Sequence, residues 1–312
     1  MERCLPMNIL VIGGTYFLGR AFVDIVKEKH CVTVLNRGNV VLSKELYKNV
    51  KQYICDRHDE EKISHIKDED FDVVVDFCAY NKGDIDLILR ALDYNIKQYI
   101  FISTCDVYKR GSGAVLDENA QLEERRFGGE AGDYISGKVA LEKEIRRCTE
   151  HEIYYTVIRP AIIYGPGNYA PRESMFFNWI VNAGQILYPI ESDGHFQMVY
   201  VEDVAKIISD LCLLEEAYNE SFNVCGKDIV NYDSFVNALR NAVYIPFEKI
   251  EVSSEMIEQK NIPLPFAIHE SESETYSDAK LLKRGVRYTS LEEGLKKSFS
   301  FYMQEESGNI TE

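Results

Sequence analysis

Short apolar runs and helix-like stretches alternate through the first half of the chain. The apolar run Asn8–Ile12 is followed by Gly19–Lys29, whose apolar residues recur at helical spacing. The same pattern predicts strands at Cys31–Leu35, Gln52–Cys55, Asp72–Phe77, Gln98–Ser103 and Tyr155–Arg159, and helices at Asp84–Asp93 and Tyr134–Cys148. Strands separated by helices of this length form βαβ units, so we expect an α/β fold with a doubly wound parallel sheet.

The alternation weakens beyond about Gly165. The pattern then predicts a helix at Met175–Ala183, a strand at Met198–Val201, a helix at Asp203–Leu214, with Asp203 as its cap, and a strand at Ser221–Val224. We expect residues 198–225 to complete the sheet begun by residues 1–165. Residues 166–197 and 226–312 are expected to form a smaller mixed α/β lobe, and a cleft between two such parts is a common ligand site.

Charge and cysteine usage narrow the functional classes. The 312 residues include 35 Lys and Arg against 51 Asp and Glu, a formal net charge of −16. This charge repels phosphate backbones and anionic membranes, so neither nucleic acid nor a membrane is the expected partner. The eight cysteines are scattered singly, without metal-ligand spacing, and no signal peptide is recognisable. We therefore expect a cytoplasmic protein without a metal site.

A glycine-rich segment separates the first predicted strand from the first predicted helix. It reads Gly13-Gly14-Thr15-Tyr16-Phe17-Leu18-Gly19. Gly13 permits a tight turn, Gly19 permits close packing of the helix on the strand, and the N–H groups at the helix start face a pyrophosphate. The segment therefore predicts binding of NAD or NADP through Gly13, Thr15, Tyr16, Phe17, Leu18 and Gly19. Tyr16 replaces an expected glycine, and its side chain either crowds the pyrophosphate or points outward.

The end of the second strand bears on the choice of nucleotide. An acidic residue there would accept a hydrogen bond from the ribose 2′-hydroxyl and favour NAD. Asn36 and Arg37 occupy this place instead, and they suit a 2′-phosphate, which favours NADP. The alternative is that Arg37 is an ordinary solvated turn residue. Asp56, after the next strand, is a candidate contact for the adenine.

Three residues are candidates for the chemistry. Thr104 closes a predicted strand, and Tyr134 and Lys138 are four residues apart at the predicted start of a helix, so they share one face. A tyrosine with a pKa near ~10 is a poor base, but a nearby ammonium lowers that pKa. The Thr104 hydroxyl can hydrogen-bond a substrate oxygen.

These motifs resemble, in order, those of the NAD-dependent epimerase/dehydratase family, the extended short-chain dehydrogenases. The resemblance rests on the glycine segment, Ser103-Thr104-Cys-Asp-Val107-Tyr108, Tyr134-x-x-x-Lys138, Arg159-Pro160…Tyr164-Gly165-Pro166-Gly167, Val201-Glu-Asp203-Val204-Ala205, Asp278-Ala-Lys280-Leu and Thr289-Ser-Leu-Glu-Glu-Gly294. It implies a Rossmann sheet with a small C-terminal substrate lobe, a bound nicotinamide nucleotide, frequent homodimers and, in many members, nucleotide-sugar substrates. It further implies that Tyr134 is the acid/base, that Lys138 holds the nicotinamide ribose and tunes Tyr134, and that Thr104 polarises the substrate oxygen.

The sequence departs from the family pattern at several positions. Cys105 and Asp106 stand where sugar dehydratases carry an Asp-Glu pair, which disfavours elimination of water. Phe196 stands where many nucleotide-sugar members carry an arginine, so the substrate need not be a typical nucleotide sugar. Asp106, His195 and Gln197 are candidate substrate-binding residues. Asp76 replaces a small residue or histidine and is a candidate cofactor contact.

The leading hypothesis is an NAD(P)-dependent epimerase or reductase that transfers hydride at a sugar-like hydroxyl or ketone, using Thr104, Tyr134 and Lys138. One alternative, motivated by Tyr16, is a non-catalytic, regulatory dinucleotide-binding protein. Another is an RNA-binding protein, because the glycine segment followed by Asn36-Arg37-Gly38 also resembles chloroplast stem-loop RNA-binding relatives of the family. The net charge opposes this second alternative.

Overall fold

Two units interleave along the chain. Unit 1 comprises Met1–Lys109, Glu118–Pro160 and Val204–Val224, and unit 2 comprises Arg110–Asp117, Ala161–Asp203 and Cys225–Glu312. The computed structural model describes residues 5–40, 42–43, 47–111 and 113–308.

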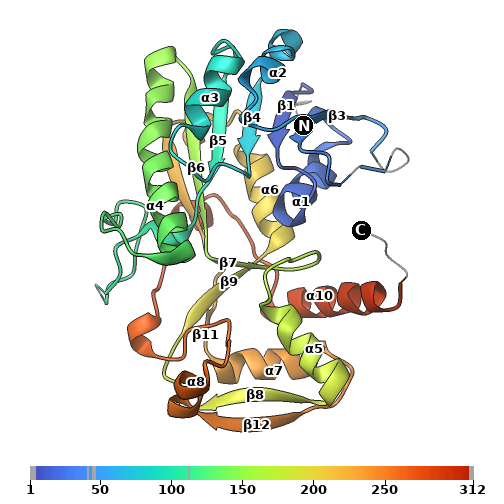
Figure 1. Cartoon of the computed structure of the whole chain (residues 1–312), viewed down its shortest axis with the longest axis vertical. Coiled ribbons are helices and arrows are strands. Elements are labelled where there is room, and N and C mark those ends of the chain that lie inside the picture. Colours follow the sequence, from blue (N-terminus) through green and yellow to red (C-terminus); the bar gives the residue numbers. More distant parts are fainter. Residues whose placement is uncertain (1–4, 41, 44–46, 112, 309–312) are drawn as a thin grey trace. The chain divides into compact units, whose positions relative to one another are not determined.

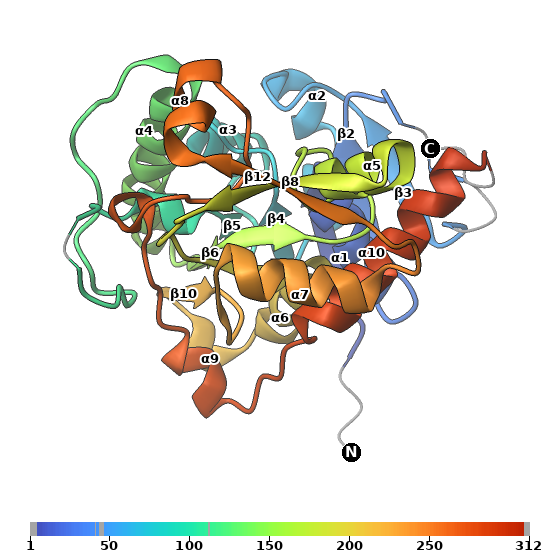
Figure 2. The same cartoon turned by 90° about the horizontal axis from the view of Figure 1, so that it is seen from below.

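Unit 1 is built on a seven-stranded parallel sheet with the strand order β10-β6-β5-β4-β1-β2-β3. The strands are β1 (Asn8–Ile12), β2 (Cys31–Asn36), β3 (Val50–Ile54), β4 (Val73–Asp76), β5 (Gln98–Ile102), β6 (Tyr154–Pro160) and β10 (Glu220–Val224). The helices are α1 (Phe17–Val26), α2 (Glu60–Ser64), α3 (Asp84–Ala91), α4 (Gly129–Glu144) and α6 (Val201–Leu211). Figures 1 and 2 show α1 and α6 on one face of the sheet and α3 and α4 on the other. The predicted doubly wound Rossmann sheet is therefore confirmed.

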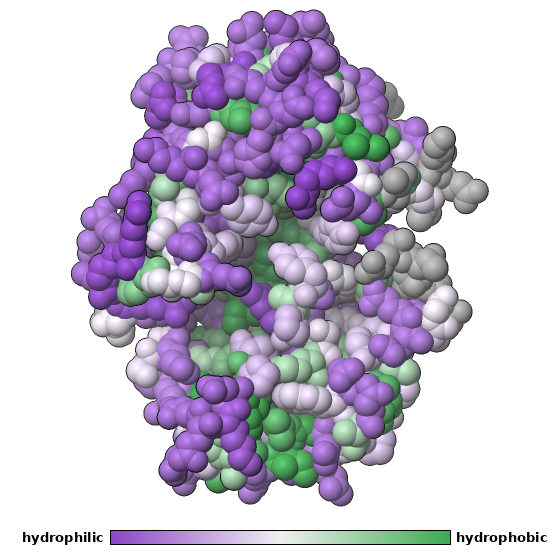
Figure 3. All heavy atoms as spheres, in the orientation of Figure 1, coloured by the Kyte–Doolittle hydropathy of each residue, from purple (hydrophilic) through white to green (hydrophobic). Residues whose placement is uncertain are grey.

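The core of unit 1 follows from the apolar stripes of its helices. Leu18, Phe22 and Val26 recur every four residues along α1 and are buried. On the opposite face, Leu141 of α4 belongs to a buried cluster that includes Leu10 of β1. The outward faces of α2, α3 and α4 are largely hydrophilic, as the purple surface in Figure 3 shows. The strand order reverses between β1 and β4, and ligands of such sheets bind at the carboxyl ends of the strands at this point.

Unit 2 is smaller and mixed, as predicted. A three-stranded sheet has the order β11-β9-β7, in which β9 is antiparallel to β11 and parallel to β7. A second sheet pairs β12 with β8. The strands are β7 (Ile162–Tyr164), β8 (Gln185–Ile190), β9 (Phe196–Tyr200), β11 (Ile229–Val230) and β12 (Glu248–Ser253). The helices are α5 (Glu173–Ala183), α7 (Tyr232–Ala242), α8 (Ser254–Lys260), α9 (Ala279–Lys283) and α10 (Leu291–Glu306), and α10 packs on α7 and α5.

Two local predictions were wrong. Helix α6 begins at Val201, so Asp203 lies inside its first turn and does not cap it. The Asp203 carboxylate instead accepts hydrogen bonds from Thr289 N (2.7 Å) and Thr289 Oγ1 (3.0 Å). Helix α4 begins at Gly129, which places Tyr134 in its second turn rather than at its start. No helix within the described part of the chain is long and apolar enough to cross a membrane.

Candidate functional site

The turn after β1 has room only for glycine at two places. Gly13 has a φ of 87°, and a Cβ there would lie 2.1 Å from Cys78 Sγ. A Cβ at Gly19 would lie 2.6 Å from the carbonyl oxygen of Gly13, a backbone atom. The glycines therefore let α1 begin close against the end of β1, so that its unpaired N–H groups can face an anion.

The other residues of the turn divide between core and surface. Thr15 and Leu18 are buried, and Phe17 is half-buried with a φ of 38°. Tyr16 is 49% exposed and occupies the N-cap position of α1, where its side chain makes no capping hydrogen bond. The Tyr16 ring is thus not packed into the interior of unit 1.

Asn36 carries an unsatisfied donor at the end of β2. Its Oδ1 accepts hydrogen bonds from Gly38 N (2.9 Å) and Gln52 Nε2 (3.1 Å). Its Nδ2 is buried and has no partner among the described residues. An unsatisfied buried N–H costs about 1–3 kcal/mol. An oxygen of a ligand at the end of β2 would remove this cost.

The two other candidate cofactor contacts near this strand, the basic Arg37 and the acidic Asp56, are exposed. Arg37 lies at the surface directly after β2. Asp56 is also exposed, and its Oδ1 accepts a hydrogen bond from His58 N (2.8 Å), which lowers the pKa of the Asp56 carboxyl.

Asp76 lies at the end of β4 and is completely buried. Its carboxylate accepts hydrogen bonds from Arg57 Nη1 (2.9 Å), Tyr99 OH (2.6 Å) and Cys78 N (2.8 Å). These contacts are all within unit 1. Asp76 therefore fixes the backbone after β4, where Cys78 meets Gly13.

Lys138 is tied to the ends of two strands. Its Nζ donates to the carbonyl oxygens of Ile102 (2.7 Å), at the end of β5, and Ala79 (2.9 Å), after β4. Burial lowers the pKa of Lys138 to about 8, although the Asp76 charge opposes this shift. The ammonium lies 5.7 Å from the centroid of the Tyr134 ring, one turn earlier in α4. At neutral pH a positive charge thus lies beside a phenol that is 37% exposed.

Thr104 and Asp106 form a local pair after β5. Thr104 Oγ1 donates to Asp106 Oδ2 (3.2 Å) and accepts from Asp106 N (3.1 Å). The hydroxyl proton of Thr104 is therefore directed at Asp106, and because a hydroxyl can rotate, this proton can be redirected to a substrate oxygen. The structure brings Tyr134 and Lys138 into contact and holds Thr104 two residues beyond the carbonyl that binds Lys138.

A buried ion pair, missed from the sequence, supports α4 beside this site. Arg159 of β6 donates through Nη2 (2.6 Å) and Nε (2.9 Å) to the carboxylate of Glu142. Ser103 Oγ also donates to Glu142 (2.6 Å), and Arg159 Nη1 donates to Tyr108 OH (2.7 Å). The Arg159 and Glu142 side chains are only 2% and 1% exposed. In the two turns of α4 after Tyr134, Lys138 is thus hydrogen-bonded to β5 and Glu142 is ion-paired with β6.

In unit 2, His195 and Gln197 hold the segment before α9. His195 is within hydrogen-bond distance of Glu270 (2.9 Å) and Thr275 (3.0 Å) through its two ring nitrogens. The Gln197 side chain accepts from Tyr276 N (2.7 Å). Phe196 lies between these two residues in the sequence. Its side chain is buried and stacks on Phe266, with ring centroids 4.3 Å apart.

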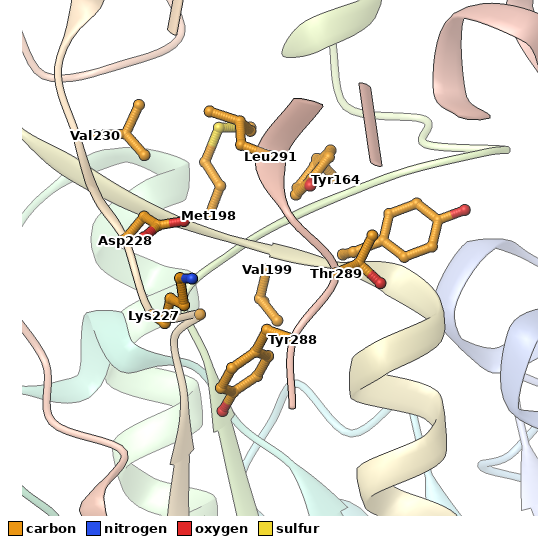
Figure 4. Close-up of a pocket in the computed structure, with 11 residues that line it drawn as sticks. Tyr164, Met198, Val199, Lys227, Asp228, Val230, Tyr288, Thr289 and Leu291 are labelled. Carbon is orange, nitrogen blue, oxygen red and sulfur yellow. The ribbon is translucent and has the colours of Figure 1, made fainter. Parts of the chain in front are cut away.

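Unit 2 also contains a small pocket (Figure 4). Met198 and Val199 come from β9, and Tyr288 and Thr289 precede α10. The volume of this cavity, about 10 Å³, suits one water molecule rather than a sugar. The described residues hold no group of three His, Cys, Asp or Glu side chains placed to bind a metal ion.

Relatives of known sequence identify the family. The model of the NAD dependent epimerase/dehydratase family matches residues 9–225. The chloroplast stem-loop binding protein of 41 kDa b from Arabidopsis thaliana is 30% identical over 261 residues, covering 78% of this chain and 65% of that protein. The UDP-glucose 4-epimerase of Vibrio cholerae is 25% identical over 183 residues, covering 53% of this chain and 55% of the epimerase. The chain thus spans less than two thirds of the length of each relative.

Solved structures show the same fold. The UDP-N-acetylglucosamine 4-epimerase of Methanobrevibacter ruminantium, in complex with UDP-N-acetylmuramic acid, superposes with a TM-score of 0.76 at 19% identity, covering 97% of this chain and 100% of that one. The UDP-glucose 4-epimerase of Thermus thermophilus, in complex with NAD, gives a TM-score of 0.73 at 18% identity, covering 95% of this chain and 99% of that one. At these identities the likeness concerns the fold alone. Because the family match extends over more than half of the sequence and includes the glycine turn and the Tyr134–Lys138 pair, this chain belongs to the NAD dependent epimerase/dehydratase family.

Proposed function

We propose that the chain is an NAD(P)-dependent epimerase or reductase that transfers hydride at a hydroxyl or ketone of a sugar-like substrate. The observation that carries this proposal is the Lys138 ammonium, held by two carbonyl oxygens beside the Tyr134 ring. A phenol next to a buried cation loses its proton more easily, which is what a general base near neutral pH requires.

Two features of unit 1 fit a dinucleotide. The glycines of the Gly13–Gly19 turn let α1 begin close against the end of β1, and the buried Asn36 Nδ2 has no partner among the described residues. Asn36 and Arg37 would hold the adenosine ribose end of the nucleotide, and Lys138 would hold the nicotinamide ribose. The bound nucleotide supplies or accepts the hydride.

The protein groups then divide the proton chemistry between them. Tyr134 takes the proton of the substrate hydroxyl during oxidation and returns one during reduction. The Lys138 charge stabilises the phenolate between these steps. The Thr104 hydroxyl turns from Asp106 to donate its proton to the substrate oxygen, so that the single proton of the substrate hydroxyl is left for Tyr134.

The proposed substrate is sugar-like, but the proposal does not require a nucleotide sugar. The solved relatives named above are epimerases of UDP sugars. In this chain Phe196 is buried against Phe266, so that position offers an apolar ring and no cation for a diphosphate. Unit 2 is the proposed substrate-binding part.

Replacing Tyr134 with phenylalanine is expected to lower turnover at least about hundredfold, because the acid/base group is lost while the ring remains. We would incubate the protein with NAD⁺ or NADP⁺ and UDP-glucose, UDP-N-acetylglucosamine, dTDP-glucose or free sugars, and follow the products by NMR. Tyr154→Phe, at an exposed tyrosine stacked on Tyr218, is the matched control and should keep full activity. Undiminished turnover by Tyr134→Phe would refute the assignment.

Replacing Arg37 with alanine is expected to weaken NADP⁺ binding about tenfold or more and to leave NAD⁺ binding unchanged. The reason is that a hydrogen bond to a charged group contributes about 1.5–3 kcal/mol, and only NADP⁺ carries the 2′-phosphate. Calorimetric titration of both nucleotides measures the difference. Lys29→Ala, which removes an exposed charge three residues after the end of α1, controls for net charge. Equal loss of both nucleotides in Arg37→Ala would contradict the role of Arg37.

RNA binding is the second candidate function, favoured by the 30% identity to the chloroplast stem-loop binding protein. The net charge of −16 opposes it. A gel-shift assay with a stem-loop RNA at physiological salt separates the two, since a shift there would support RNA binding.

A further inference from the structure

Tyr80 lies beside the Tyr134–Lys138 pair, although no sequence motif includes it. It follows β4 and is 44% exposed. Its ring centroid is 6.3 Å from that of Tyr134, with 46° between the ring planes. The Lys138 Nζ lies 4.7 Å from the Tyr80 centroid, closer than to the Tyr134 centroid at 5.7 Å. Tyr80 therefore contacts both members of the pair.

The backbone of Tyr80 is fixed against α4. Its N–H donates to Asp84 Oδ2 (2.8 Å), and the carbonyl oxygen of the preceding Ala79 accepts from Lys138 Nζ (2.9 Å). A Cβ at Gly137 would lie 2.0 Å from the Tyr80 carbonyl oxygen. Only glycine at 137 allows this approach without a backbone shift, so the turn of α4 that carries Lys138 is fitted to Tyr80.

The Lys138 charge needs local support because the side chain is buried. A cation over an aromatic face is stabilised, most strongly where water is excluded. Phe101 offers a second face, with its centroid 4.9 Å from Nζ. The other charged or titratable groups that act on Lys138 are Asp76, Cys78, Arg57 and Asp84. Asp76 and Asp84 are both paired with Arg57, at 2.9 Å and 3.9 Å, so the carbonyl oxygens and ring faces are the remaining support for the Lys138 charge.

We propose that Tyr80 is a positioning residue for hydride transfer: its ring keeps Lys138 charged beside Tyr134, and thereby sets the proton affinity of the Tyr134 phenol. This inference rests on the proposed function of Tyr134. Without the Tyr80 ring, Lys138 would be neutral more often, the phenolate would lose its partner, and the pKa of Tyr134 would rise.

The test is to titrate Tyr134 directly in the whole protein, without nucleotide or substrate. Tyrosines labelled with ¹³C at the ζ carbon are followed by NMR against pH, and the signal missing from Tyr134→Phe identifies Tyr134 among the 20 tyrosines. Tyr80→Leu is expected to raise the pKa of Tyr134 by about half a unit to one unit. Tyr80→Phe, which keeps the ring and loses the hydroxyl, is expected to leave it unchanged.

Two outcomes would overturn the proposal: an unchanged pKa of Tyr134 in Tyr80→Leu, or an equal rise in Tyr80→Leu and Tyr80→Phe, which would assign the effect to the hydroxyl. If Tyr80→Leu does not fold, Tyr80→Trp serves instead, since its larger ring face should hold the pKa at or below the wild-type value and a rise would refute the proposal. Because the titration uses no substrate, its failure is distinct from a failure of Tyr134→Phe to lose turnover.

Discussion

Gly19→Ala is expected to weaken the binding of both NAD⁺ and NADP⁺ by about ten- to hundredfold. The added Cβ would lie 2.6 Å from the Gly13 carbonyl oxygen, so the start of α1 must move away from the end of β1. Overpacking of this kind costs about 1–3 kcal/mol, which corresponds to the stated loss of affinity when the strain falls on the binding turn. Calorimetric titration of the purified protein with each nucleotide measures it.

The matched control for this variant is Gly128→Ala. Gly128 has a φ of −77°, and a Cβ there would meet no atom within 4 Å, so the same methyl group is added without a clash. Its nucleotide affinity should equal that of the wild type. Circular dichroism shows whether Gly19→Ala keeps its secondary structure. Wild-type affinity in a folded Gly19→Ala would mean that the nucleotide does not use this turn.

Glu142→Gln is expected to lower the free energy of unfolding by about 3–5 kcal/mol. The substitution leaves the Arg159 guanidinium buried without its counter-charge, and an uncompensated buried charge has a cost of this size. The loss is measured as a lower midpoint in thermal unfolding followed by circular dichroism. Because the chain has two units, the transition need not be two-state, and fluorescence of the single tryptophan, Trp179, reports unit 2 separately.

Two further variants test whether the loss of stability comes from the uncompensated buried charge of Arg159. The double variant Glu142→Met with Arg159→Met removes both charges and should recover most of the lost stability, since apolar replacements of buried pairs are often neutral. Lys206→Met breaks the exposed pair with Asp210 and should hardly change the midpoint. An unfolding midpoint of Glu142→Gln equal to that of the wild type would show that the pair does not stabilise unit 1.

The sequence was sufficient to predict the main sheet, together with helix α5 and strand β9 of unit 2, but not the other strands of unit 2. Parallel strands buried on both faces are continuous apolar runs, so β1, β4 and β5 are visible without tertiary information. Strands β7 and β11 are only three and two residues long, and β8 contains Pro189, so no run of this kind marks them. Helix α10 contains many charged residues, yet it buries Leu295 and Phe299.

The sequence predicts which residues lie close together within one helix, but it does not predict contacts between different helices and strands. Tyr134 and Lys138 are four residues apart in one helix, so their proximity follows from helix geometry. Tyr80 is distant from Lys138 in the sequence and reaches it only because the segment after β4 packs on α4. The Glu142–Arg159 pair likewise joins a helix to a strand, and only the folded chain shows that Asn36 retains an unsatisfied donor.

The three-segment composition of unit 1 has a consequence for synthesis on the ribosome. Strand β10, which pairs with β6 from Glu220↔Thr156 to Val224↔Pro160, is made only after the intervening segment of unit 2. Until residue 224 has emerged, β6 is an open edge with apolar faces and unpaired backbone groups, the kind of surface on which nascent chains misassemble. Between the emergence of Pro160 and that of Val224, the growing chain therefore exposes an edge that chaperone binding would protect.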